Sequence, residues 1–149
     1  VWGDSLAAGK AKRDPALGDL QIVVGVSVAI GDDVDSALEQ VRPQLALYIG
    51  GMGARGKNFY NDLARRYGYE DEARTSQDLY LDGRKAEAAA VVPDELVRAV
   101  SLVGPESYVA ERVAAFREAG VTTLVLQPLD GSPEGRLRTV ETMRKLAAR

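Results

Sequence analysis

Cysteine and histidine are absent from the 149-residue chain, and it contains only two methionines and one tryptophan. These absences exclude a disulfide framework, a thiolate zinc site, a cysteine nucleophile and a histidine-based catalytic triad within these residues. Any chemistry must therefore depend on carboxylates, hydroxyls, Arg and Lys side chains, or a bound cofactor.

Long apolar runs and clusters of basic residues are also missing. The sequence has no 18-residue apolar run and no signal peptide, which predicts a cytoplasmic protein with no membrane partner. The net charge is −3 and the basic residues alternate with acidic ones, so we expect no nucleic-acid partner. The acidic cluster Glu70, Asp71 and Glu72 has no Cys or His companion, which favours a helix N-terminus over a metal site. We predict no bound metal.

The start of the chain is unusual because it reads Val1-Trp2, and both methionines lie far from it. Residues 4–15, DSLAAGKAKRDP, are typical of the end of a helix followed by a loop. We therefore expect the chain to be the C-terminal portion of a longer protein.

The pattern along the chain predicts an α/β protein. Residues 20–30 and 122–127 are apolar and rich in β-branched residues, as buried parallel strands are. Helices are expected between and after these strands. One of them is an amphipathic helix whose apolar stripe runs from Val34 to Tyr48, with an N-cap at Asp32 or Asp33. The last helix, 134–148, is expected to turn Leu137, Val140 and Leu146 inward. Two parallel strands cannot hide their own apolar surface, so further strands must come from missing sequence or from another chain.

Gly51, Gly53 and Gly56 match the G-x-G-x-x-G pattern of a dinucleotide-binding loop. That loop requires a strand before the glycines, whereas the preceding residues have helical spacing. No second strand ending in an acidic residue follows at the expected distance. We favour glycines that end a helix and form a turn.

Four segments together resemble the C-terminal portion of the luciferase-like monooxygenase family, in particular its deazaflavin-dependent oxidoreductases. They are residues 34–60, VPDELV at 92–97, SLVGPESYVAERVAAFREAGVTTLVL at 101–126, and RLRTVETMRKL at 136–146. The resemblance implies a TIM (β/α)8 barrel. The chain would be one fragment of that single domain, 1–149, with the last two parallel strands and a helical insertion at about residues 45–100 between them.

The same resemblance implies an oxidoreductase that transfers a hydride between reduced coenzyme F420, an 8-hydroxy-5-deazaflavin, and a small organic substrate. FMN is the alternative cofactor. Most residues that hold the cofactor in this family belong to the first six strands, so we expect the 149 residues alone to be inactive. The missing N-terminal half of the barrel is then a required partner, and the catalytic residues are not assigned here.

TIM-barrel sites lie at the C-terminal ends of the strands. We therefore expect cofactor or substrate contacts from the following residues: Gly31, Tyr48, Gly50, Gly51, Met52, Asn58, Phe59, Tyr60 and Gln127. Each has a structural alternative. The glycines, Tyr48 and Met52 could belong to the insertion core and a helix end, the aromatic residues could anchor a short helix, and Gln127 could cap a strand.

A second hypothesis is a non-catalytic helical interaction module. The Tyr-rich and Ala-rich insertion could pack as a helical layer, and the apolar strand faces could bind a partner or a second copy in a homodimer.

Overall fold

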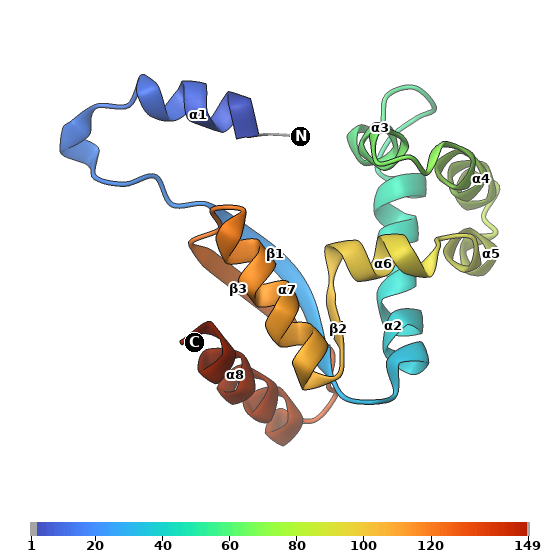
Figure 1. Cartoon of the computed structure of the whole chain (residues 1–149). Coiled ribbons are helices and arrows are strands. Elements are labelled where there is room, and N and C mark those ends of the chain that lie inside the picture. The colour runs from blue at the N-terminus through green and yellow to red at the C-terminus, as the bar shows by residue number, and fades with distance from the viewer. Residues whose placement is uncertain (1–2, 149) are drawn as a thin grey trace.

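The computed structural model describes residues 3–148 and has an α/β fold around a three-stranded parallel sheet. The central strand β1 (Val23–Ile30) pairs on one side with β2 (Leu102–Gly104) and on the other with β3 (Thr123–Pro128), as Figure 1 shows. Strands β1 and β3 confirm the two predicted strands. The expectation of only two strands was incomplete, because β2 has three residues and is defined by its pairing with the end of β1 rather than by a pattern of its own.

One face of the sheet is covered by α7 (Glu106–Glu118) and α8 (Pro133–Ala147). Val26 and Val28 of β1 pack there in a core with Val109, Val113 and Met143. Leu146 is buried as predicted, whereas Leu137 and Val140 are 59% and 44% exposed. The prediction for these two residues was wrong because a three-residue repeat drifts around a helix that has 3.6 residues per turn. Leu137 lies on the side opposite Leu146, and the buried face of α8 is formed by Gly135, Met143 and Leu146.

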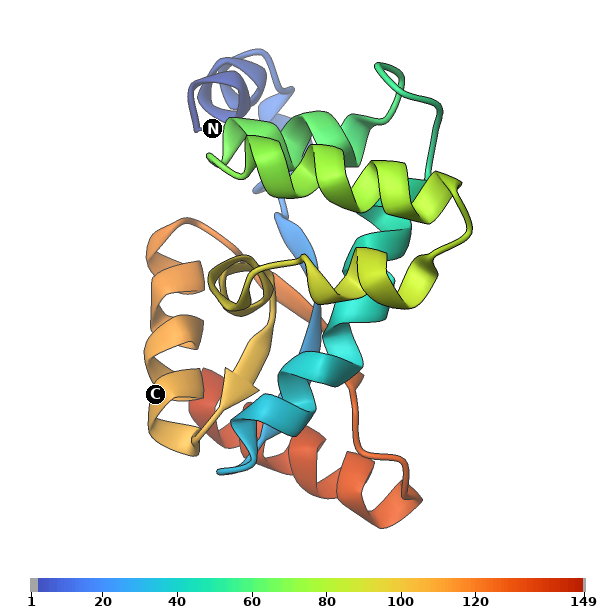
Figure 2. The same cartoon turned by 90° about the vertical axis from the view of Figure 1, so that its right-hand side faces the viewer.

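The second layer is a helical lobe inserted between β1 and β2. It contains α2 (Val34–Ala46), a π-helical turn η2 (Leu47–Gly51), α3 (Phe59–Arg66), α4 (Glu70–Leu81), α5 (Lys85–Ala90) and α6 (Asp94–Val100). Figure 2 shows α2 as the long helix on which the others are stacked. The lobe has its own core, which includes Leu38, Val41, Leu96 and Val97. The predicted domain limits, including an insertion at about 45–100, stay a prediction.

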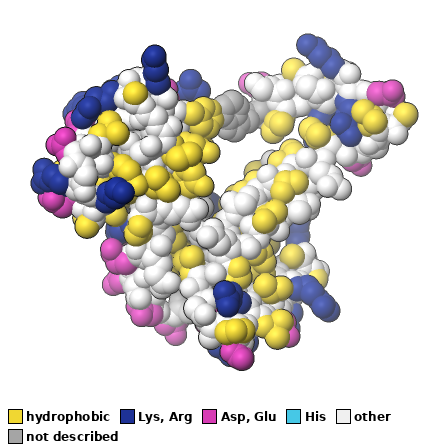
Figure 3. All heavy atoms as spheres, turned by 180° about the vertical axis from the view of Figure 1, so that it is seen from behind, with side chains coloured by type: hydrophobic (Ala, Val, Ile, Leu, Met, Phe, Trp, Pro, Cys, Tyr) yellow, Lys and Arg dark blue, Asp and Glu magenta, His cyan; other side chains and the backbone are white. Residues whose placement is uncertain are grey.

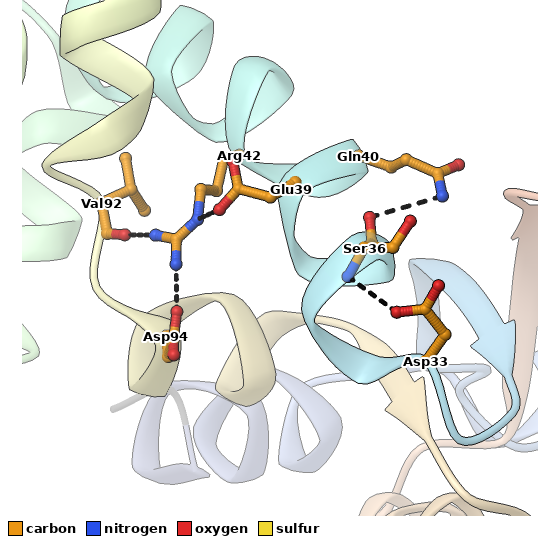
Figure 4. A network of polar contacts seen from close by, with 7 residues as sticks. All are labelled: Asp33, Ser36, Glu39, Gln40, Arg42, Val92 and Asp94. Atoms are coloured by element: carbon orange, nitrogen blue, oxygen red, sulfur yellow. Dashed lines mark hydrogen bonds and ion pairs between the residues drawn. The ribbon is translucent and has the colours of Figure 1, made fainter.

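Arg42 joins the first and last parts of this lobe. Its guanidinium donates to the backbone oxygen of Val92 and to the Asp94 carboxylate, and at 2.8 Å to Glu39 (Figure 4). The Arg42 side chain is only 12% exposed. Its neighbour Pro43 lies inside α2 and cannot donate a backbone hydrogen bond. The Arg42 side chain therefore attaches α2 to residues 92–94 next to the position where the helix lacks that hydrogen bond.

The chain before the sheet consists of α1 (Gly3–Ala11) and a 3₁₀ turn, η1 (Pro15–Leu17). Helix α1 has no buried residue and extends away from the sheet in Figure 1. Within residues 3–148, no helix has the length and apolar character needed to span a membrane.

Candidate functional site

The odd-numbered residues of β1 and β3 face away from α7 and α8. Gly25 pairs with Val125, and Ser27 pairs with Gln127, so these four residues share one face of the sheet. This face is open: Val125 is 56% exposed, and a side chain built at Gly25 would meet no atom within 4 Å. Figure 3 shows this side of the molecule, with hydrophobic side chains along the strands and on the lobe beside them.

A groove of about 430 Å³ lies between this face and the helical lobe. Its volume falls within the range of about 300–1,000 Å³ found for small-molecule sites. The sheet contributes the face just described, and the lobe contributes apolar and aromatic side chains and the amide of Gln44. The lobe residues that line the groove are Val41, Gln44, Leu45, Tyr48, Tyr60 and Val100.

Tyr48 and Tyr60 form an aromatic pair in the wall of the groove. Their ring centroids are 4.7 Å apart and the planes are tilted by 46°, within the range of favourable aromatic pairs. Phe59 extends the cluster, with its ring edge-on to Tyr60 at 5.4 Å. Tyr48 and Tyr60 come from different elements, so the pair exists only because η2 and α3 are held together.

Asn58 holds them. This residue is 1% exposed, and its side-chain amide donates to the backbone oxygens of Tyr48 and Ile49 at 3.0 and 2.9 Å. Its own amide oxygen caps α3 by accepting from the backbone N–H groups of Tyr60 and Asn61. Asn58 therefore positions the tyrosine pair from within the lobe and contacts the groove through neither of its polar atoms.

Gly50 and Gly51 lie against Tyr80 of α4. A Cβ at Gly50 would be 2.5 Å from the Tyr80 Cβ, and one at Gly51 would overlap the Tyr80 ring. These glycines permit close packing of η2 on α4. Gly56, with a φ of 73°, adopts the left-handed conformation in the following turn. Helical residues precede Gly51, as predicted, and the strand that a dinucleotide loop requires is not there.

Gly31 lies apart from the groove, at the end of β1. It lines a separate cavity of about 270 Å³ at the carboxyl ends of β1 and β3, together with Asp33, Asp130 and Thr139. Both carboxylates are engaged locally. Asp33 accepts from the Ser36 N–H at the start of α2, as Figure 4 shows, and Asp130 accepts from the hydroxyl and N–H of Ser132. These hydrogen bonds, with smaller contributions from Arg138 and Arg136, lower the pKa of Asp130.

The structure thus brings together three of the nine predicted site residues, Tyr48, Tyr60 and Gln127, with Phe59 beside them. Met52 is half exposed outside the groove lining. Sequence reasoning missed Gly25, Ser27, Gln44 and Val125. Ser27 carried a usable signal, since it is the one polar side chain within β1.

The residues that line the groove carry hydroxyl and amide groups but no charged side chain. Such a lining can bind an uncharged planar ring and orient its polar edge by hydrogen bonds. No group of three or more Asp, Glu, Cys or His side chains that could hold a metal ion occurs in the described part of the chain.

Comparison of the sequence with known proteins identifies an enzyme family. The sequence model of the luciferase-like monooxygenases matches residues 1–123. A protein of Mycobacterium tuberculosis, provisionally named a coenzyme F420-dependent oxidoreductase, is 42% identical over 108 residues. That match covers 72% of this chain and 31% of the relative, so the chain spans about a third of the length of the curated protein it matches.

Proposed function

The chain belongs to the luciferase-like monooxygenase family, and from this premise we propose that it is part of an oxidoreductase that transfers a hydride between a deazaflavin and a small organic substrate. The observation that carries the proposal is the pairing of Ser27 with Gln127 on the open face of the sheet, beside Tyr48 and Tyr60. Coenzyme F420 is the preferred cofactor because the Mycobacterium tuberculosis relative is named for it. FMN is the alternative.

We further propose that the sheet is the last part of a (β/α)8 barrel. In such a barrel the helices cover the outside of the strands, and the other face of each strand points into the barrel. Helices α7 and α8 would be the outer layer, and Ser27 and Gln127 would point inward. A parallel sheet normally has both faces covered. The exposed Val23 and Val125 on the inner face, and Leu137 on α8, would then be covered by the remaining strands and helices.

The groove residues fit a deazaflavin or flavin ring. The ring system has broad apolar faces and a polar edge of carbonyl and N–H groups, which match the tyrosine rings and the amides of Gln44 and Gln127 respectively. The open space above Gly25 lets a planar group approach the backbone. The bound cofactor would supply the hydride chemistry. Gln127 and Ser27 would orient the polar edge, and Tyr48 and Tyr60 would exclude water from the ring face.

The test is a fluorescence titration of coenzyme F420, and in parallel FMN, against this chain expressed within its full reading frame. Replacing Gln127 by Leu removes both hydrogen-bonding groups at similar size, and we expect at least tenfold weaker binding of the deazaflavin. The matched control is Gln21→Leu, since Gln21 is exposed just before β1 and outside the groove. Absence of binding by a folded full-length protein would refute the oxidoreductase proposal, and equal effects of both substitutions would refute the role of Gln127.

The second candidate is a non-catalytic module in which the open sheet face binds a partner or a second copy of the chain. The separate core of the helical lobe and the exposed Val23 and Val125 favour it. Sedimentation of the 149-residue chain distinguishes the two proposals when the cofactor titration is negative. A stable dimer that is broken by Val125→Glu would support the module, whereas a monomer at all concentrations would contradict a homodimer.

A further inference from the structure

A second cavity lies in the helical lobe, between α2, η2, α3 and α6, and opens to solvent beside Tyr60 and Tyr67, which are 40% and 43% exposed. Its volume is about 190 Å³. Every residue that lines it is aliphatic or a tyrosine, and the lining has no charged group, amide or aliphatic hydroxyl. The lining residues are Leu45, Tyr48, Ile49, Tyr60, Leu63, Ala64, Tyr67, Leu96 and Val100.

This cavity adjoins the groove on the sheet. Both are lined by Leu45, Tyr48, Tyr60 and Val100, so the tyrosine pair forms a shared wall. A ligand held in the groove would therefore have its nearest apolar volume on the other side of these two rings. Leu63 and Leu96 line the cavity but not the groove, which makes them separate reporters of it.

The walls of the cavity are held in place by buried polar contacts. Asn58 fixes the backbone at Tyr48 and Ile49, and Asn61 donates to the backbone oxygens of Ile49 and Ala73 at 3.1 and 2.7 Å. Both asparagines are buried. The backbones of η2, α3 and α4 therefore cannot move relative to one another without breaking these hydrogen bonds, which would cost free energy.

We propose that this cavity is the subsite for the hydrocarbon part of the substrate, an uncharged ring or short alkyl chain. That the ligand of this cavity is the substrate rests on the proposed oxidoreductase function. The capacity of the cavity to bind an apolar group does not depend on that function. An enclosed cavity of about 150 Å³ lined by Leu, Ile and Phe binds benzene, so the volume of this more open one is sufficient for a single ring, whereas drug-sized ligands need about 300 Å³ or more. The observed volume therefore suits one ring rather than a whole cofactor. A carboxylate or amine would lose its hydration here without gaining a partner.

The experiment is an NMR titration of the 149-residue chain with benzene, followed through the methyl groups of Leu63 and Leu96. We expect saturable shifts of these methyls and intermolecular nuclear Overhauser effects between them and benzene. Benzoate, the charged comparison, should bind at least tenfold more weakly. Leu63→Trp should fill the cavity and weaken benzene binding at least tenfold. The matched control is Leu137→Trp, on the exposed face of α8, which should leave it unchanged.

Absence of saturable shifts and Overhauser effects at Leu63 and Leu96 in the unmodified chain would overturn the inference. Equal binding of benzene and benzoate at these methyls would also overturn it. The Overhauser effects need no variant, so the test stands if Leu63→Trp fails to fold. Failure of the proposed function shows separately, as absence of deazaflavin binding by the full-length protein while benzene still binds in the cavity of the 149-residue chain.

Discussion

The side-chain amide of Asn58 donates to the backbone oxygen of Ile49 at 2.9 Å, and both residues are buried. The same side chain caps α3. One residue thus joins η2 to the start of α3, and thereby holds Tyr48 beside Tyr60. In this lobe, the geometry of the aromatic pair depends on a residue that does not line the groove.

Replacing Asn58 by Ala should lower the free energy of unfolding by about 2–4 kcal/mol. The loss combines a helix N-cap, worth about 1 kcal/mol, with two hydrogen bonds to the backbone oxygens of Tyr48 and Ile49, worth about 1–3 kcal/mol together; Ile49 keeps Asn61 as a donor. Urea denaturation measures it. Asp62→Ala, at an exposed position of α3, is the control. A loss no greater than that of the control would contradict the structural role of Asn58.

Gly51→Ala should destabilise the lobe by about 1–3 kcal/mol, because the new Cβ overlaps the Tyr80 ring. Tyr80→Ala should rescue most of this effect, since it removes the ring. It should not rescue Gly50→Ala, whose Cβ meets the Tyr80 Cβ and the backbone oxygen of Ser76. A double-mutant cycle by thermal denaturation gives both coupling energies. Equal rescue of the two glycine variants would contradict the separate contacts assigned to Gly50 and Gly51 with Tyr80.

Ser132→Ala should raise the pKa of Asp130 toward its ordinary value of 3.8, because the hydroxyl is the largest cause of its lowering. A carboxyl group whose pKa is lowered in the folded state stabilises the protein above the unfolded value, and this contribution is lost as the pH falls through the folded pKa. The stability difference between the two proteins should therefore shrink below about pH 4.

NMR titration of the Asp130 carboxyl carbon measures this shift directly. The Ser132 hydroxyl also caps α8 by accepting from the Gly135 N–H at 3.0 Å, and that part of the stability difference should persist at low pH. Ser107→Ala, on the exposed side of α7, is the control and should leave the Asp130 titration unchanged. An unaltered Asp130 pKa in Ser132→Ala would refute the assigned cause.

Arg42→Met should lower the free energy of unfolding by about 1.5–3 kcal/mol, because a mostly buried guanidinium loses its contacts with Val92 and Asp94. Arg84→Met is the matched control. Arg84 pairs with Glu87 on an exposed helix start, where salt bridges contribute little, so its urea midpoint should stay within error. Similar losses for both variants would contradict the attachment role of Arg42.

Several helices could be predicted from sequence because their signals are local. The acidic start predicted at Glu70 matches the first residue of the observed α4, and Asp33 caps α2 as one of the two expected residues. Strand β1 was recognisable from its β-branched residues. In contrast, β2 has three residues, and its strand conformation depends on hydrogen bonds to Val28–Ile30. Nothing in so short a segment distinguishes it from a loop.

The candidate site was predicted only in part, because some of its residues can be recognised from the local sequence and others cannot. Tyr48, Tyr60 and Gln127 stood out as polar or aromatic residues at the ends of elements. Ser27 was missed, since its importance comes from its register opposite Gln127. The roles of all these residues in binding stay a prediction.

The α/β class, the long strand, most helices and the family follow from periodicity, composition and residue order. Which side chains share a face depends on the folded chain: the pairing of Ser27 with Gln127, the contact of Tyr48 with Tyr60, and the packing of Gly51 on Tyr80. Strand register and helix contacts arise from interactions between residues far apart in the chain, and no local pattern records them.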